Sequence, residues 1–286
     1  MRAKCYDDYL QERQALKPKD IDTLLESGRK WKLDSILSSG GAVVFPHTFL
    51  SSCGSYIAAA VHAALDSGAD HVVALGVLHA TTPFQKEARH LERERKNVDS
   101  LHLRALFGDD LPNSQELQYE YSLLSFQFLW DEEVKRRAIK PPKLFCRYPF
   151  LVNREPETMP GIKELSVLAK DAAIVATSDF CHHGVAYDEP DALPIGQSAR
   201  SFAEANIVHH LQVLTEGSYE AFYEHCFKIK SDSYDVGSML KYLCKPSSGT
   251  LLDMQLVDTS MLYENNPSPS WVAASLVALQ SKMKIR

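Results

Sequence analysis

Two histidines directly follow two apolar, β-branched runs of the chain. His47 comes after the run at residues 42–46, and His79 comes after the run at residues 71–78. Residues 54–66 lie between these runs, are rich in alanine and end before a Ser-Gly-Ala-Asp sequence, which predicts a helix. A strand, a helix and a second strand form a parallel crossover unit. Because ligands bind beyond the carboxyl ends of such strands, we expect the two imidazoles to share one ligand, with a metal ion as the first candidate.

A third apolar run, at residues 172–177, is also followed by titratable side chains. The next seven residues, SDFCHHG, contain Asp179, Cys181 and His182. Serine and aspartate at such a point can cap the following segment, and glycine allows the chain to turn. Two adjacent imidazoles beside a carboxyl and a thiol exceed what a cap requires. We therefore interpret this segment as a further part of the same site.

The six cysteines, at positions 5, 53, 146, 181, 226 and 244, show no paired spacing. This pattern is typical of a reducing compartment and favours a cytoplasmic protein over a disulfide framework. Most free cysteines are small buried hydrophobic residues. The neighbours of Cys244 challenge this default, because the Lys-Pro-Ser-Ser-Gly sequence after it breaks a predicted helix at residues 236–243 and could expose the thiol. Taken alone, a cysteine at this position is more often buried and structural.

Composition and charge limit the classes of partner. The chain has 286 residues, of which 45% are hydrophobic and 24% charged, and its formal net charge is −6. These values are typical of a soluble protein with a substantial core. Nucleic-acid binders carry a clustered basic face, so we expect no nucleic-acid partner. No apolar stretch approaches the roughly 20 residues of a membrane helix, and the polar start of the chain predicts no secretory signal.

Periodicity and turn residues predict the remaining elements. A strand is expected at 144–152, whereas 86–97 is expected to be a solvated loop or helix face. Residues 251–263 and 271–279 fit either a strand or a helix. Further helices are predicted within 19–37 and at 117–130, 162–168, 199–214 and 219–227. Since strands and helices alternate without a repeat or linker, we predict one α/β domain over residues 1–286 with a largely parallel or mixed sheet.

Four short motifs together resemble the Memo family, a structural relative of the class III extradiol dioxygenases. They are FPH at 45–47, GVLH at 76–79, SDFCHHG at 178–184 and YLC at 242–244. A Glu-x-Ser sequence at 120–122 lies where the family has its Glu-x-Ser helix, but the family usually has a second histidine or glutamate in that helix. The resemblance spans residues 42–279. The chain departs from the family in having Thr48-Phe49 where Ala-Gly is usual, and Lys245-Pro246 where Gly-Arg is usual.

The resemblance implies a fold and a set of site residues. The fold would be a central sheet with helices on both faces, as in class III extradiol dioxygenases, and residues 271–279 would be a strand. His47, His79 and Cys244 would occupy the metal-ligand positions. His182 would face the metal as the acid/base residue, with Asp179 as the neighbouring acid.

These observations lead to three functional hypotheses. In the first, His47, His79 and Cys244 bind a divalent transition metal, with iron ahead of copper or zinc, in a dioxygenase-like non-haem oxidoreductase. In the second, the same fold binds a metal or a peptide without catalysis. In the third, Cys244 or Cys181 is a nucleophile activated by His182, although neighbours in a strand point to opposite faces. The ligand would be a small molecule or a peptide, and the sequence leaves the oligomeric state open.

Overall fold

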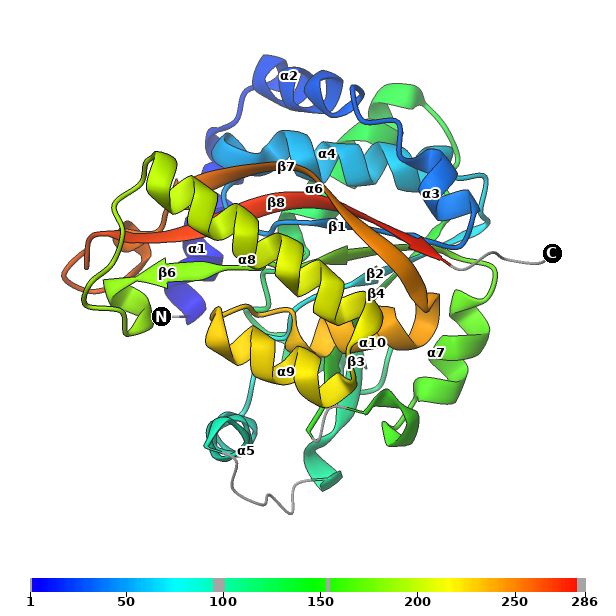
Figure 1. Cartoon of the computed structure of the whole chain (residues 1–286). Coiled ribbons are helices and arrows are strands. Elements are labelled where there is room, and N and C mark those ends of the chain that lie inside the picture. The colour runs from blue at the N-terminus through cyan, green and yellow to red at the C-terminus, as the bar shows by residue number, and fades with distance from the viewer. Residues whose placement is uncertain (1, 95–100, 153–154, 282–286) are drawn as a thin grey trace.

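Helices cover both faces of one mixed sheet in the computed structural model (Figure 1), which describes residues 2–94, 101–152 and 155–281. Within those residues the eight strands of the sheet follow the order β3-β4-β2-β5-β1-β8-β6, and β7 pairs with β8. The strands are β1 (Ala42–Phe45), β2 (His71–Leu75), β3 (Ala105–Gly108), β4 (Lys143–Phe150), β5 (Ala173–Thr177), β6 (His182–Gly184), β7 (Pro246–Asp258) and β8 (Ser270–Ser281). The predicted α/β class with a mixed sheet is confirmed.

The helices account for most of the remaining described chain. The α-helices are α1 (Arg2–Ala15), α2 (Pro18–Gly28), α3 (Asp34–Ser38), α4 (Leu50–Asp66), α5 (Pro83–Arg93), α6 (Leu124–Arg137), α7 (Ile162–Ala169), α8 (Gln197–Glu216), α9 (Tyr219–Lys228) and α10 (Tyr234–Cys244). Short 3-10 turns are η1 (Leu101–Leu103), η2 (Ser114–Leu117), η3 (Pro156–Thr158), η4 (Val185–Tyr187) and η5 (Ser260–Leu262). None of the helices in the described residues has the length and apolarity needed to cross a membrane.

Two layers of apolar side chains, one on each face of the sheet, form the core. Val43 and Phe45 of β1 pack on the side of α4 and α6, whereas Ala42 and Val44 pack on the side of α7, α8 and α10. Figure 1 shows α2, α3 and α4 over one face and α8, α9 and α10 over the other. Successive strand residues point to opposite faces, so a strand covered on both sides must be apolar throughout. This explains the unbroken apolar runs in the sequence.

The parallel strands bring three chain segments to the same edge of the sheet. β1 pairs in parallel with β5, β5 with β2, and β2 with β4. The carboxyl ends of β1, β2 and β5 therefore lie together. His47, His79 and the segment that begins at Ser178 all follow these ends, as the sequence predicted.

The segment after β5 crosses the end of β1. The Ser178 amide donates a hydrogen bond to the Phe45 carbonyl, with an N–O distance of 3.0 Å. Further along, the Ala273 amide donates to the Cys181 carbonyl at 2.9 Å, and His182 pairs with Val272 of β8. Residues 178–181 thus move from beside β1 to beside β8. This crossing places Thr177 of β5 and Asp179, which lies between β5 and β6, against His47.

The sequence-based boundaries were wrong in two places that matter for the site. The predicted helix at 117–130 begins only at Leu124, as α6, and the preceding residues form a turn and a loop in which Tyr119 has φ of 65°. The charged segment at 86–97 is helical up to Arg93, and residues 95–97 lie outside the described residues. It is not simply solvated, because Arg89 and Glu92 are buried.

Of the last two ambiguous segments, 271–279 is a strand, whereas 251–263 is a strand only up to Asp258 and continues into η5. Residues 251–263 begin within β7, and residues 271–279 lie within β8, which confirms the strand expected at the end of the chain. The sequence did not predict α1, β3 or β6. β3 and β6 are short strands with four and three residues, too short to produce a clear periodicity.

Candidate metal centre

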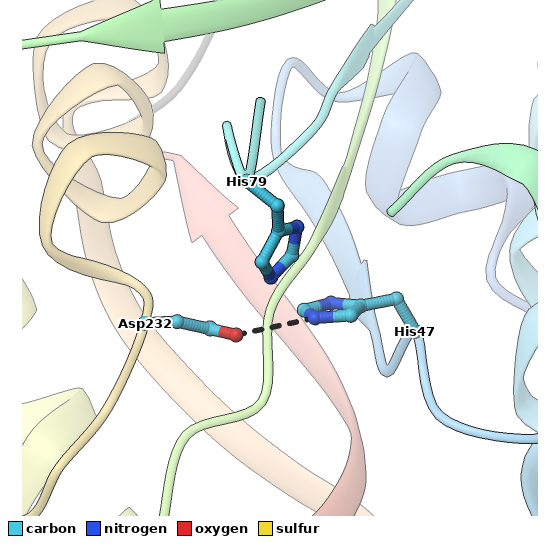
Figure 2. Close-up of side chains that lie close together, drawn as sticks. All are labelled: His47, His79 and Asp232. Atoms are coloured by element: carbon cyan, nitrogen blue, oxygen red, sulfur yellow. Dashed lines mark ion pairs between the residues drawn. The ribbon is translucent and has the colours of Figure 1, made fainter. Parts of the chain in front are cut away.

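Side chains from three separate segments converge at the carboxyl edge of the sheet. His47 follows β1, His79 follows β2, and Asp232 lies in the loop between α9 and α10 (Figure 2). One potential ligand atom from each lies within 4.8 Å of the other two. His47 Nε2 and Asp232 Oδ2 are 3.2 Å apart. Two imidazoles and a carboxylate therefore face a common point.

The orientation of His47 is fixed by the strand beside it. Its Nδ1 lies 3.1 Å from the hydroxyl oxygen of Thr177, the last residue of β5. This contact turns Nε2 towards Asp232 and towards Asp179, whose Oδ2 is 3.6 Å away. The His47 side chain is only 5% exposed. Its second nitrogen is thus directed at two buried carboxyl groups.

Glu120 holds His79 in place. His79 Nδ1 lies 3.2 Å from Glu120 Oε1, and the same carboxylate accepts the backbone N–H groups of His79 and Ala80 at 2.6 and 2.9 Å. The amides of Tyr121 and Ser122 donate to it as well. Burial opposes ionisation of this carboxyl, but the charge and hydrogen bonds of His79 and the backbone amides lower its pKa. A carboxylate on the far nitrogen is the usual support of a metal-binding histidine, and it leaves Nε2 facing the group.

Tyr121 further restricts the ring of His79. The two rings are stacked, with centroids 4.2 Å apart and planes inclined by 19°. The ring of Tyr9 in α1 is also stacked with the ring of Tyr121, with centroids 5.3 Å apart. The His79 imidazole is therefore held by a hydrogen bond at one edge and by an aromatic face along its plane.

The two aspartates differ in how their oxygens are used. Asp232 Oδ1 accepts the Ser178 hydroxyl at 2.8 Å and the Asp179 amide at 2.9 Å, which leaves Oδ2 for the group with His47. Asp179 is 2% exposed. Its Oδ1 is buried and has no hydrogen-bond partner within the described residues. A buried acceptor without a partner is rare and indicates that a cation, a proton or a water is needed there.

The charges of the group are strongly coupled. Burial disfavours a charged His47, but Asp179 and Asp232 outweigh it and raise the pKa of His47 to about 9. Burial alone would raise the pKa of Asp232, but His47, His182 and His79 hold it well below its usual range. Burial raises the pKa of Asp179, only partly offset by His47. In the metal-free chain, a proton on His47 thus supplies the positive charge that these carboxyl groups require.

These residues fit a divalent metal ion. The donor set of two imidazole nitrogens and a carboxylate oxygen is one that transition metals bind in proteins. The Nδ1 atoms of His47 and His79, which point away from the group, already have hydrogen-bond partners. Asp179 Oδ1 has none within the described residues. The site is therefore oriented, anionic and buried, and it can hold a metal ion.

His182 and Asp179, the predicted acid/base pair, lie beside this group. Ligand atoms of Asp179, His182 and Asp232 also fall within 4.8 Å of one another. His182 Nδ1 lies 2.6 Å from the Lys230 carbonyl oxygen, to which it donates, so Nε2 is the free nitrogen. The ring of Tyr187 lies 5.0 Å away. The structure thus brings four of the five predicted site residues together: His47, His79, Asp179 and His182.

Cys244 is the predicted ligand that the structure does not bring to the group. It ends α10 and lines a cleft with Gly40 and Ala172, which precede β1 and β5. Its carbonyl accepts the hydroxyl of Ser281 at 2.9 Å, at the far end of β8. These neighbours place Cys244 at the amino ends of the parallel strands, across the sheet from His47. The expectation that it completes the ligand set is corrected, and Asp232 occupies that place.

The Cys–His hypothesis gains no support from the same geometry. Cys244 and His182 lie at opposite edges of the sheet. Cys181 is 1% exposed, and burial, together with the charge of Glu189, raises the pKa of its thiol to about 12. A nucleophilic cysteine needs a lowered thiol pKa and access to solvent.

Asp232 and Glu120 are the site residues that the sequence did not assign. Asp232 lies in a Ser-Asp-Ser sequence between two helices, which is also typical of a helix N-terminus, so no local signal marked it as a ligand. Glu120 fell inside a segment predicted to be helical. Comparison of the sequence with known protein families and with curated proteins gave no match. The structure alone therefore carries the assignment of this group as a candidate metal centre.

Proposed function

We propose that the chain is a Memo-like, metal-dependent oxidoreductase of the extradiol dioxygenase type, with His47, His79 and Asp232 as the metal ligands. The observation that carries this proposal is the convergence of two imidazoles and one carboxylate within 4.8 Å at the ligand-binding edge of the sheet. Two histidines and one carboxylate with open positions are the ligand set of non-haem Fe(II) oxygenases.

Iron is the proposed physiological metal, with copper and zinc as competitors. A carboxylate in place of a thiolate makes the donor set harder and removes a sulfur atom that oxygen chemistry would oxidise. Copper and zinc bind such sites more tightly than Fe(II) when all are available. The metal found in a purified sample therefore depends on supply as well as on the site.

The residues around the ligands have separate roles in this proposal. His47, His79 and Asp232 would hold an Fe(II) ion, which would supply Lewis-acid and redox chemistry and make a substrate hydroxyl group more acidic. His182 would accept the proton of that hydroxyl, because its Nδ1–H is fixed on the Lys230 carbonyl and its Nε2 is free. Asp179, with Oδ1 unpartnered, would accept a hydrogen bond from a water or a substrate hydroxyl.

Anaerobic loading with Fe(II), followed by measurement of dioxygen uptake with a panel of catechols, tests the proposal. The wild type should bind about one Fe(II) per chain and consume oxygen. Asp232→Asn should lose both properties, while Cys244→Ala, the matched control at the other edge, should retain them. Iron binding without any oxygen uptake would instead favour the hypothesis of a non-catalytic metal-binding protein.

A further inference from the structure

Two clefts open beside the candidate metal centre. The first, of about 340 Å³, is lined by His79 together with Lys86 and Arg93 of α5. The second, of about 510 Å³, is lined by His182 together with Lys230 and, again, Arg93. The side chain of His79 is 22% exposed, so a ligand in the first cleft can reach it. Arg93 lines both clefts.

These clefts are positively charged in a protein that is otherwise acidic. The formal net charge of the chain is −6, yet both clefts carry cationic side chains. Arg89 also lines the first cleft, but its guanidinium forms ion pairs with the carboxylates of Asp235 and Glu92, at N–O distances of 2.5 and 2.8 Å. Lys86, Arg93 and Lys230 form no ion pair with a carboxylate in the part of the chain that is described.

The other charged groups do not cancel this charge. Asp235, the acidic residue that lines the first cleft, is paired with Arg89, and Asp188, the one that lines the second cleft, is exposed. His90, in the first cleft, is paired with Glu94 on its own helix at 3.2 Å. Cations that line a cleft concentrate the electrostatic field there and attract anions. The charge therefore favours an anionic ligand between α5 and the α9–α10 loop.

The neighbours of Arg93 and Lys230 connect this charge to the site. The Arg93 guanidinium lies 5.4 Å from the ring centre of Phe227 in α9, which holds it over the second cleft. Lys230 has φ of 56°, in the left-handed region, and its carbonyl is the acceptor that orients His182. The backbone of Lys230 thus positions the proposed base while its side chain lines the cleft beside it.

We infer that the two clefts bind a small organic anion, whose carboxylate or phosphate group lies against Arg93 and Lys230 while its reacting end faces His182 and the metal ligands. This inference rests on the proposed function, since it identifies the anion as the substrate of that site. Arginine matches the geometry of both anionic groups, whereas lysine contributes a point charge. Lys86, an exposed residue that lines the first cleft, would strengthen the attraction of the anion at a distance.

Calorimetric titration of the metal-free protein with phenyl phosphate, benzoate and phenol tests this inference. At least one of the two anions should bind about tenfold or more tightly than phenol, because charge-assisted hydrogen bonds are stronger than neutral ones. The preferred anion distinguishes a phosphate site from a carboxylate site. Arg93→Gln and Lys230→Gln should each abolish most of this preference. Lys228→Gln removes the same charge from the exposed end of α9 and should leave it unchanged.

Two results would overturn the inference. One is equal affinity for phenol and both anions, and the other is an anion preference that persists in both cleft variants. Lys230→Gln retains the backbone carbonyl that orients His182, so misplacement of that ring does not complicate the result. Metal-free protein separates this test from the proposed function. Failure to consume oxygen would leave the anion preference intact, and failure to bind anions would leave oxygen uptake with neutral catechol intact.

Discussion

The two edges of the same sheet differ sharply in what they gather. At the carboxyl ends of the parallel strands, two imidazoles and two aspartates lie close together, and one buried aspartate oxygen has no partner among the residues that the structure describes. At the amino ends, Cys244 lies in a cleft among Gly40, Ala172 and Ser281, with no histidine or carboxylate among the lining residues. The comparison shows that position in the sheet decides which polar residues meet, more than their residue type does.

The difference follows from the direction of the strands. Each parallel strand releases its chain at the carboxyl edge, so residues that directly follow three strands converge there. The crossing of residues 178–181 over the end of β1 adds Asp179 to this group. Chain at the amino edge arrives from helices, and α10 ends there. The following predictions test this contrast, beginning with the largest expected effect.

Removal of a ligand at the carboxyl edge should abolish metal binding. We expect His47→Ala and Asp232→Ala to lower metal affinity by more than about 100-fold, since loss of even an outer partner costs about 10–100-fold. Competition with a chromophoric chelator measures the affinity of each folded variant. Wild-type affinity in the Asp232→Ala variant would show that Asp232 is not a ligand and would remove the contrast between the two edges.

Loss of the support of His79 should have a smaller effect. Glu120→Gln removes the charge on His79 Nδ1 but keeps an oxygen for the backbone amides. We expect metal binding to weaken by about 10–100-fold, which is less than the loss caused by removal of a ligand. Glu116→Gln, an exposed residue of η2, is the matched control. Equal affinity in the two variants would mean that Glu120 supports the loop and not the metal.

The pH dependence of metal binding should reflect the proton on His47. Its pKa is raised to about 9, because Asp179 and Asp232 outweigh the effect of burial, so a metal ion must displace this proton at neutral pH. Apparent affinity should therefore increase between pH 6 and pH 9, by up to about tenfold per pH unit. His90→Gln, at the surface, is the control. A flat profile over this range would show that His47 binds metal without losing a proton.

The same shift predicts the stability of the metal-free chain. A histidine with a folded-state pKa above its ordinary 6.5 stabilises the fold fully below that pH and loses the contribution as pH rises through about 9. The melting temperature of metal-free protein should therefore fall over this interval, and bound metal should remove the dependence. An unchanged melting temperature from pH 6.5 to 9 would argue against a charged His47.

Substitution at the amino edge should have the smallest effect. Cys244 is 4% exposed, so Cys244→Ala should cost about 1 kcal/mol of stability through lost packing. Its metal affinity should equal that of the wild type. Denaturant unfolding and chelator competition on the same preparation measure both quantities. A loss of metal affinity in this variant would reverse the assignment of the two edges.

Much of the fold and part of the site could be predicted from the sequence. The runs that became β1, β2 and β5 are apolar because both faces are covered, and the residues after them mark the ligand edge. This rule predicts the positions of four site residues, His47, His79, Asp179 and His182. Asp232 does not, because it reaches the site from between α9 and α10, and its approach depends on how these helices pack. The local sequence pattern contains no information about how α9 and α10 pack.

The wrong third ligand has a physical cause. The residue type of Cys244 and its place late in the family-like pattern predict a ligand, and the broken helix after it predicts exposure. In the structure α10 runs away from the ligand edge, so its first turn lies near Asp232 and its last residue is at the opposite edge. Asp232 precedes the start of this helix and Cys244 ends it. The sequence therefore pointed to α10, the helix that begins next to the site, but to the residue at its opposite end.

X-ray absorption spectroscopy of the zinc-loaded protein tests the central claim most directly. If His47, His79 and Asp232 are the protein ligands, the first shell will contain only nitrogen and oxygen, at about 2.0–2.2 Å. It will remain free of sulfur in Cys244→Ala and will lose occupancy in Asp232→Ala. A sulfur scatterer at about 2.3 Å in the wild type would contradict the account, because it would place a cysteine on the metal.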